Sequence, residues 1–421
     1  MQLIKRHSGL VLAALSLGFA KCAAEPAVLY PTGGGPTTFE RGATAADTGS
    51  LTFDAGDLWA SSDGYFRLEF KGTAKRNFNV YVFISSYAGE GATGRRLSGY
   101  VDGFDCSQVN VARDYRRVYR VEPGSRSVRI TFFDATKAEN VKVTAATEAD
   151  AVAFGDEIWS EVNKDSLFER ALAKYPIPKT AFDRLPKFKE ALAGGAPFKV
   201  HLLGDSIAQD TFASPFRALI RRAYPNSNLA FTMHAEGSTG CPKYAKDEFR
   251  AIVPDDTDLL VICGIDNFAG NGFTTVENAA KALGDVIQRA KDAGMEILYL
   301  SPMKSYDSRG ITDEAVLTDV LTSAGVDGRN GGVNIWYAGR SASAWDRSAD
   351  IWAKKAYHPA ERNAVLEAKD VQCWDVFPLV QEVVSQSGRP YGWFNRDPAH
   401  NNVYGKELIA RTFLEYVKAA Q

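Results

Sequence analysis

The sequence predicts two folded regions within its 421 residues, a β-sandwich followed by a doubly wound α/β domain with a parallel sheet. Three observations lead to this division. In residues 25–150, short segments of alternating hydrophobicity are separated by Gly, Pro, Asn and Asp, without long helical periodicity. In residues 197–421, apolar strands alternate with helical segments, which is typical of a parallel sheet. Between them, residues 151–196 predict a connector of two short helices that runs into a Gly-Gly-Ala-Pro break.

Residues 1–24 have the pattern of a secretory signal peptide. A positive start is followed by the apolar run 10–20 and by small residues that predict cleavage after Ala24. The apolar run is too short to span a bilayer. Cys22 raises the alternative of a lipid anchor, which Lys21 disfavours because a small residue is wanted at that position. We therefore expect a secreted or periplasmic protein without a membrane span.

The composition of the mature chain excludes several kinds of partner. The formal charge is −2, and removal of the three basic residues of the signal peptide makes it −5. No basic patch stands out, so nucleic acid is not an expected partner. The sequence has no CxxC motif and no clustered Cys/His pattern, so we expect neither a metal nor a cofactor. Four cysteines are too few for a disulfide framework in so long a chain; they are Cys106, Cys241, Cys263 and Cys373.

The strands of the first region are short and end at turn residues. The segment 122–125, Glu-Pro-Gly-Ser, is typical of a hairpin turn. Several short strands with regular turns are typical of a β-sandwich. The expected strands are 64–70, 78–84, 108–111, 117–121, 128–133 and 141–144.

The second region reads as strand and helix in alternation. Apolar residues at helical spacing define its helices, and short apolar runs define its strands. The expected strands are 200–203, 228–235, 258–263, 297–300 and 371–374, and the expected helices are 215–220, 276–293, 377–384 and 404–420.

A candidate nucleophile follows the first of these strands. The apolar segment 200–203 runs into Gly204-Asp205-Ser206, and a helix begins after it. A serine at a strand-to-helix turn has its hydroxyl lifted out of the sheet, and its N–H lies at the positive end of the helix. An oxyanion formed by attack on a carbonyl needs donors at such a place. The alternative is that Ser206 only caps the helix.

A candidate general base lies near the other end of the chain. Asp397 precedes His400 by three residues, just before the closing helix 404–420. At this spacing a carboxylate can reach the Nδ1 atom of the imidazole, fix its tautomer and stabilise the imidazolium that forms when His400 takes a proton from Ser206. The alternative is a structural histidine bonded to its neighbour.

These paired blocks resemble the SGNH (GDSL-like) hydrolase superfamily over about residues 196–421. The resemblance implies a flavodoxin-like, three-layer α/β/α fold in which Ser206, His400 and Asp397 are catalytic. A jelly-roll-like sandwich before such a domain also resembles two-domain carbohydrate acetylesterases. That resemblance implies either a carbohydrate-binding, cleft-shaping module or a structural cap on the catalytic domain.

The family resemblance also implies three oxyanion donors. The first is the N–H of Ser206, and the second is the N–H of a glycine, for which Gly237 fits better than Gly240. The third is the asparagine of a Gly-x-Asn-Asp block, which here reads Gly-Ile-Asp-Asn. An ionised Asp266 cannot donate a hydrogen bond, so Asn267 is the expected donor.

Four residues are expected to contact substrate. Trp393 lies shortly before Asp397, and Asp205 lies beside the serine. Trp336 and Trp345 belong to an aromatic-rich insertion whose rings suit stacking on sugars. The alternative is that such rings anchor a helical insertion to the core.

The expected function is therefore hydrolysis of acetyl esters on a polysaccharide or glycan by a serine esterase. The alternative is a secreted glycan-binding protein with a degenerate, inactive esterase fold. Two departures from the family pattern favour this alternative, the order Asp266-Asn267 and the segment 207–210, Ile-Ala-Gln-Asp, where Thr-x-Gly is common. The two hypotheses differ in whether Ser206 and His400 meet.

Overall fold

The computed structural model describes most of the chain after the expected signal peptide. Residues 1–24 lie outside it, so secretion and cleavage after Ala24 stay predictions. Within the described part, no helix has the length and apolar character needed to cross a membrane. The described residues are 26–32, 37–40, 49–61, 64–74, 80–103, 111–132, 136–237, 239–246, 249–263, 275–301, 359–388, 393–397 and 400–420.

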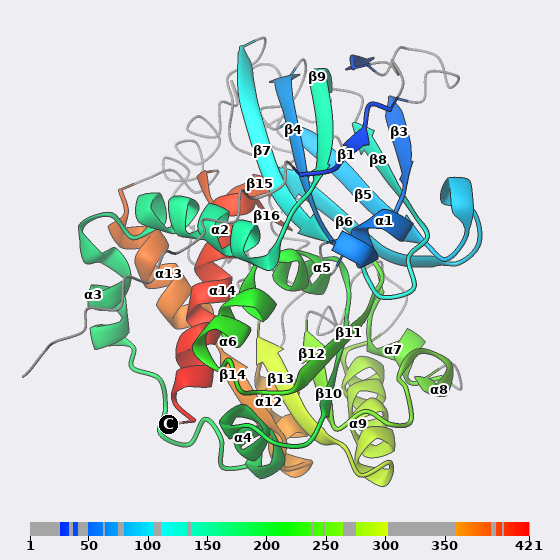
Figure 1. Ribbon diagram of the computed structural model, residues 1–421. Helices are drawn as coiled ribbons and strands as arrows, with labels where there is room; N and C mark the ends of the chain where they lie inside the picture. The colour runs from blue at the N-terminus through cyan, green and yellow to red at the C-terminus, as the bar shows by residue number, and fades with distance from the viewer. Residues whose placement is uncertain are drawn as a thin grey trace, which may run out of the picture.

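Two antiparallel sheets form the N-terminal region, drawn in blue to cyan in Figure 1. The first has the order β1-β9-β4-β7 with β2 paired to β9, and the second has the order β3-β8-β5-β6. The strands of the first sheet are β1 (Val28–Tyr30), β2 (Phe39–Glu40), β4 (Tyr65–Ala74), β7 (Ala112–Arg120) and β9 (Thr136–Ala145). Those of the second are β3 (Ser50–Asp54), β5 (Tyr81–Tyr87), β6 (Arg96–Gly103) and β8 (Ser127–Phe132), with helix α1 (Gly56–Ser61) after β3.

The two antiparallel sheets share one hydrophobic cluster. Phe53 of β3 meets Phe66 of β4 edge to face at 5.3 Å, and Phe70 of β4 meets Phe132 of β8 at 5.2 Å. Aromatic pairs in this geometry add to the stabilisation from burial alone. Five of the six expected strands correspond to β4, β5, β7, β8 and β9. The sixth, 108–111, lies almost wholly outside the described residues.

Helix α2 (Glu148–Val162) begins directly after β9 and was not among the expected helices. Thr147 and Asp150 form a capping box at its start. The two expected connector helices follow as α3 (Leu167–Lys174) and α4 (Pro186–Ala193). The connector is therefore more helical than expected.

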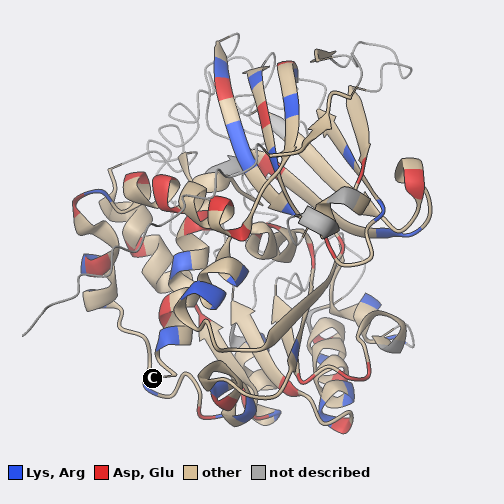
Figure 2. Ribbon diagram, viewed as in Figure 1, with Lys and Arg blue, Asp and Glu red and all other residues tan. Residues whose placement is uncertain are grey.

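Acidic side chains of α2 pair with arginines on both sides of it, and Figure 2 shows the red segments of this helix near blue segments of neighbouring elements. Asp150 pairs with Arg67 of β4 at 2.8 Å, and Glu157 pairs with Arg116 of β7. In the other direction, Glu148 pairs with Arg221 at 3.3 Å, and Asp156 pairs with Arg222 at 2.8 Å and with Arg411 at 2.6 Å. Helix α2 thus joins the antiparallel sheets to the helices of the second region.

The second region contains a five-stranded sheet in the order β11-β10-β12-β13-β14, with every neighbouring pair parallel. In chain order this is 2-1-3-4-5, the order of flavodoxin-like doubly wound sheets. The crevice between the carboxyl ends of the first and third strands is the usual ligand site in this topology. The strands are β10 (Phe198–Gly204), β11 (Leu229–Ala235), β12 (Leu259–Cys263), β13 (Glu296–Ser301) and β14 (Gln372–Asp375).

Helices cover both faces of this sheet, as Figure 1 shows. Alternate residues of β10 enter different clusters, Leu202 on one face and Leu203 on the other. The cluster that contains Leu202 also contains side chains of α4, α6 (Phe216–Ala223), α13 (Phe377–Gln386) and α14 (Val403–Lys418). The opposite cluster contains side chains of α7 (Cys241–Tyr244), α8 (Phe249–Ile252), α9 (Val276–Asp292) and α12 (Pro359–Ala368). The region is a three-layer α/β/α arrangement.

Candidate active site

Ser206 is the first residue of α5 (Ser206–Ala213), which begins immediately beyond the carboxyl end of β10. It therefore lies at the position where the topology of the sheet places a ligand site. The carboxylate of Asp205 accepts hydrogen bonds from the N–H groups of Ile207 at 2.8 Å and Ala208 at 3.3 Å. These bonds form the N-cap of α5 and do not use the N–H of Ser206. That N–H remains suited to an oxyanion.

The turn before Ser206 has room only for glycine at position 204. A Cβ there would overlap the Cβ of Ala208 and the carbonyl oxygen of Cys263. The Gly204 carbonyl accepts a hydrogen bond from the Tyr244 hydroxyl at 2.7 Å and another from the Glu236 N–H at 3.0 Å. Burial raises the pKa of Tyr244, so its hydroxyl keeps its proton and donates across the working pH range. These two hydrogen bonds fix the end of β10, from which Ser206 follows.

His400 meets Ser206 although 194 positions separate them in the sequence. His400 opens β16 (His400–Asn401), which pairs with β15 (Asn395–Asp397). Its Nε2 atom lies 2.9 Å from the Oγ of Ser206. An imidazole nitrogen at this distance can accept the hydroxyl proton.

Asp397 is the backbone partner of His400 in this short antiparallel ladder. The ladder brings the two residues face to face across a tight hairpin. The side chain of Asp397 lies outside the described atoms, so its contact with the Nδ1 atom of His400 stays a prediction.

Gly237 lies against the serine. A Cβ built on Gly237 would stand 3.7 Å from the Cβ of Ser206. The alternative residue, Gly240, is the N-cap of α7. Asp266 and Asn267 both lie outside the described residues, so the third oxyanion donor stays a prediction.

The four expected substrate contacts have different outcomes. Asp205 is 3% exposed, and its carboxylate caps α5. It is therefore a capping residue in this structure, and its expected role as a substrate contact stays a prediction. Trp336 and Trp345 lie outside the described residues.

Trp393 is half-buried beside the hairpin that carries His400. Its ring stacks on Tyr404 with centroids 4.0 Å apart, and it meets Phe394 edge to face at 4.7 Å. Its carbonyl accepts a hydrogen bond from the side-chain amide of Asn402 at 2.8 Å. Trp393 thus anchors the hairpin, and its expected contact with substrate stays a prediction.

Asp210 was missed by the sequence analysis. It lies one helical turn after Ser206 on α5, and its Oδ2 atom accepts a hydrogen bond from the N–H of Asn401 at 3.2 Å. The neighbouring Gln209 donates from its side-chain amide to the carbonyl of Ala235 at 2.8 Å. The unusual sequence Ile-Ala-Gln-Asp after the serine therefore ties α5 to β11 and to the histidine strand. The spacing of four residues between Ser206 and Asp210, which places both on one face of a helix, was the signal from which Asp210 could have been found.

Metal ligands are a separate question. Among the residues that the structure describes, no group of three His, Cys, Asp or Glu side chains could hold a metal ion. Cys241 and Cys263 are buried, and Cys373 is half-buried.

Similarity to known proteins is found among solved structures, at low scores. No protein-family model and no curated protein matches the chain. Among solved structures it is similar to an alpha/beta hydrolase from the Lake Arreo metagenome, with 14% identity, 55% of this chain and 99% of that one covered, and a TM-score of 0.38. It is similar to an acetylxylan esterase from Geobacillus stearothermophilus, with 14% identity, coverages of 53% and 96%, and a TM-score of 0.36. It is also similar to a GDSL-like lipase from Parabacteroides merdae, with 14% identity, coverages of 54% and 99%, and a TM-score of 0.37. Because these scores are low, we base the function on the site geometry.

Proposed function

We propose that this protein is a serine esterase of the SGNH (GDSL-like) type, with Ser206 as nucleophile and His400 as general base. The observation that supports this most is the 2.9 Å distance between Ser206 Oγ and His400 Nε2. It occurs at the first residue of a helix, beyond the central strand of a 2-1-3-4-5 parallel sheet. Nucleophile, base and helix N-terminus are the groups that acyl transfer requires together.

The reaction proceeds in two displacements. His400 Nε2 takes the proton of Ser206 as Oγ bonds to the ester carbonyl, and Asp397 orients the imidazole from the Nδ1 side. The oxyanion is held by the N–H groups of Ser206 and Gly237 and by the side-chain amide of Asn267. His400 returns the proton to the departing alcohol oxygen as the ester C–O bond breaks, which leaves an acyl-serine. Water, deprotonated by His400, then attacks the acyl carbon. The bond between this carbon and Ser206 Oγ breaks, His400 returns its proton to Oγ, and the carboxylic acid is released.

We infer that the substrate is an acetyl ester on a polysaccharide or glycan outside the cytoplasm. The expected signal peptide supports the location. The two antiparallel sheets support a β-sandwich domain over residues 25–150, joined by the connector 151–196 to a catalytic domain over residues 197–421. Aromatic residues near the cleft, Trp393 among them, suit a sugar ring. The mature sequence contains no long apolar segment of the kind that forms a lipase lid.

The second candidate function is glycan binding without catalysis. The observation that favours it is the order Asp266-Asn267, because an ionised carboxylate at the oxyanion would repel it. Loss of one oxyanion donor typically costs about 10²–10³ in rate, which slows an esterase but leaves measurable turnover. The approach of Ser206 to His400 supports the esterase, since a binding protein has no use for it.

The deciding experiment compares two serine variants of the full chain. Ser206→Ala is expected to lower turnover of p-nitrophenyl acetate by about 10⁴-fold or more, because the nucleophile is lost. Ser227→Ala is the matched control, since Ser227 lies in the loop before β11, at the opposite end of the strands from Ser206, and its hydroxyl donates to the local Tyr224 carbonyl at 2.7 Å. Its turnover should equal that of wild type.

Acetate release from acetylated xylan, compared with hydrolysis of a long-chain p-nitrophenyl ester, tests the substrate class. Faster turnover of the long-chain ester would contradict the glycan assignment. Undiminished activity in Ser206→Ala would contradict the mechanism itself.

A further inference from the structure

A lysine with no exposed side-chain surface lies where the two regions meet. Lys406 of α14 is 0% exposed, and its Nζ donates to the carbonyl of Val101 at 2.9 Å and to Asp102 Oδ1 at 2.7 Å. Both acceptors belong to β6 of the antiparallel region. On the other side, Nζ lies 3.5 Å from Oδ1 of Asp210 on α5. A cation so far from water depends on these oxygens for its stability.

The carboxylate of Asp210 also reaches the histidine strand. Its second oxygen, Oδ2, accepts the N–H of Asn401 at 3.2 Å. Asn401 is fully buried and directly follows His400. One carboxylate on the helix of Ser206 therefore bonds to the backbone beside His400, while its other oxygen faces Lys406. Asp210 therefore connects the helix that begins at Ser206 to the strand that begins at His400.

Asp102 is itself held from its own region. Its Oδ2 accepts a hydrogen bond from the hydroxyl of Tyr119 at 3.0 Å and lies 3.3 Å from the Nε of Arg117. Although burial opposes ionisation, the charges of Lys406 and then Arg117 hold the pKa of Asp102 below its ordinary value. Two cations and two carboxylates thus balance one another in a buried site, so removal of one charge disturbs the other three.

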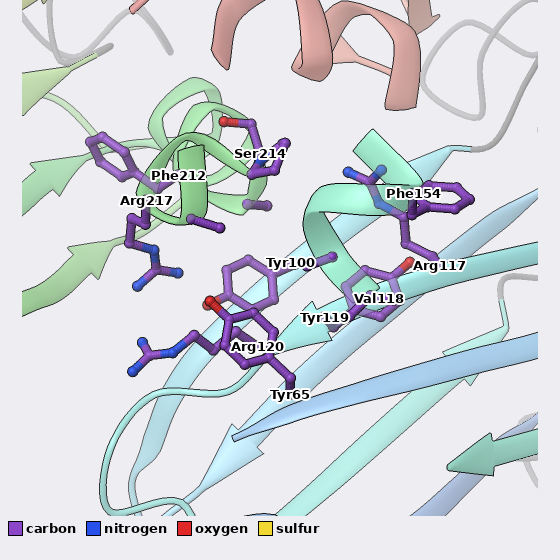
Figure 3. A pocket seen from close by; sticks show the side chains of 14 residues that line it. Tyr65, Tyr100, Arg117, Val118, Tyr119, Arg120, Phe154, Phe212, Ser214 and Arg217 are labelled. Atoms are coloured by element: carbon purple, nitrogen blue, oxygen red, sulfur yellow. The ribbon is translucent and has the colours of Figure 1, made fainter. Parts of the chain in front are cut away.

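A small cavity at the same boundary lies apart from Ser206 and His400. Figure 3 shows Tyr100, Arg117 and Tyr119 facing Phe212 and Arg217 across it. Its volume is about 40 Å³, room for only a few water molecules at ~10–15 Å³ each. Neither Ser206 nor His400 is among its lining residues. At this boundary the antiparallel region contributes the charge of Asp102, which pairs with Lys406.

We propose that Asp102 is a positioning residue for the esterase reaction, which acts through Lys406 on Asp210 and thereby fixes the backbone that carries His400. This role rests on the proposed function. Without the charge of Asp102, Lys406 has Asp210 as its remaining charged partner and moves toward it. The carboxylate then turns from the Asn401 N–H, and His400 loses its alignment with Ser206. Displacements of about 1 Å near a reacting group cost up to ~10²-fold in rate.

The test replaces Asp102 by asparagine, which keeps the shape and removes the charge. Asp102→Asn in the full chain is expected to lower kcat for p-nitrophenyl acetate on the order of tenfold, with KM unchanged. The matched control is Glu122→Gln. Glu122 also pairs across the boundary, with Arg217 of α6 at 3.1 Å, and the two side chains are 6% and 8% exposed. Glu122→Gln should destabilise the protein similarly while its folded form keeps the wild-type kcat.

A double-mutant cycle separates positioning from general weakening. If Asp102 acts through Asp210, then Asp102→Asn causes no further loss of kcat in an Asp210→Asn background. If the losses of kcat caused by Asp102→Asn and Asp210→Asn multiply in the double variant, the two residues act independently and the proposal is overturned. A kcat of Asp102→Asn equal to that of Glu122→Gln would also overturn it. Urea denaturation of each variant establishes the folded fraction.

A milder variant covers the case in which Asp102→Asn does not fold. Tyr119→Phe removes only the hydroxyl that donates to Asp102 and is expected to lower kcat about two- to threefold, in line with the loss of one hydrogen bond of ~0.5 kcal/mol. An unchanged kcat would overturn the role. If turnover is lost in Ser206→Ala but unchanged in Asp102→Asn, the positioning role of Asp102 is overturned and the proposed esterase function stands. If turnover is not lost in Ser206→Ala, the proposed function is overturned, and the positioning role with it.

Discussion

Gly204 and Ala208 approach so closely that a methyl group on Gly204 would overlap the Cβ of Ala208. The contact lies between the end of β10 and the first turn of α5, on either side of Ser206. Gly204→Ala is therefore expected to lower the free energy of unfolding by roughly 1–3 kcal/mol and to reduce kcat, because strand and helix must separate. Chemical denaturation and p-nitrophenyl acetate turnover measure the two effects.

The control for Gly204 is Gly284 in helix α9. A Cβ there meets its nearest atoms at an ordinary 3.9 Å. Gly284→Ala should leave activity unchanged and raise stability by up to ~1 kcal/mol through helix propensity. If Gly204→Ala and Gly284→Ala had the same kcat and the same free energy of unfolding, the steric explanation for Gly204 would be contradicted.

Asp205 offers a test of capping against substrate binding. Asp205→Ala removes the acceptor for the N–H groups of Ile207 and Ala208 and should cost about 1–2 kcal/mol of stability. Asp205→Asn retains an acceptor oxygen and should cost much less. KM should stay at the wild-type value in both variants. A rise in KM without loss of stability in these variants would indicate that Asp205 contacts substrate.

His201 makes stability depend on pH. It lies buried in β10, with Nδ1 2.8 Å from the Thr232 hydroxyl. Burial, and then the charge of His234, lower the pKa of His201 to about 3. Its pKa in the unfolded chain is about 6.5, so between those values the unfolded state binds a proton that the folded state excludes. The free energy of unfolding should therefore fall as pH drops from about 6.5 toward about 3, by at most ~1.4 kcal/mol per pH unit, and show no contribution from His201 above pH 6.5.

Urea denaturation at several pH values measures this dependence. The variant His201→Gln cannot titrate, so its stability should decline less steeply on acidification than that of wild type. Parallel curves for the two proteins would show that His201 does not exclude its proton.

Trp393 is proposed to contact the glycan while it anchors the histidine hairpin. Its stacking partner, Tyr404, occupies one face of the ring. Trp393→Ala is expected to raise KM for acetylated xylan about three- to tenfold, the value of one lost aromatic contact. KM for p-nitrophenyl acetate, which lacks a sugar, should change less. An equal change for both substrates would indicate that Trp393 serves the hairpin alone.

The sequence predicted those parts of the site that are encoded locally. Ser206 follows an apolar strand and precedes a helix, and His400 follows an aspartate at a fixed spacing, so each can be recognised within about ten residues. The apolar runs of the parallel sheet were recognisable for the same reason, since strands buried on both faces are almost continuously hydrophobic.

Other features depend on tertiary contacts that no local pattern records. Lys406 and Asp102 are 304 positions apart, and a lysine on an amphipathic helix normally belongs to its solvated face. Helix α2 was missed because its charged residues face arginines from both regions, which blurs the periodicity of an ordinary surface helix, and because Gly155, a poor helix former, lies within it.

The burial of Lys406 also constrains how this chain can change over generations. A descendant that exchanged its antiparallel sheets for another module would leave a buried ammonium group without the acid of β6 that neutralises it. Recombination at the boundary therefore carries a penalty unless position 406 changes at the same time or the incoming module brings an acid to the same place. The two halves are in this sense inherited together, and a lineage that keeps Lys406 should keep an acidic partner for it.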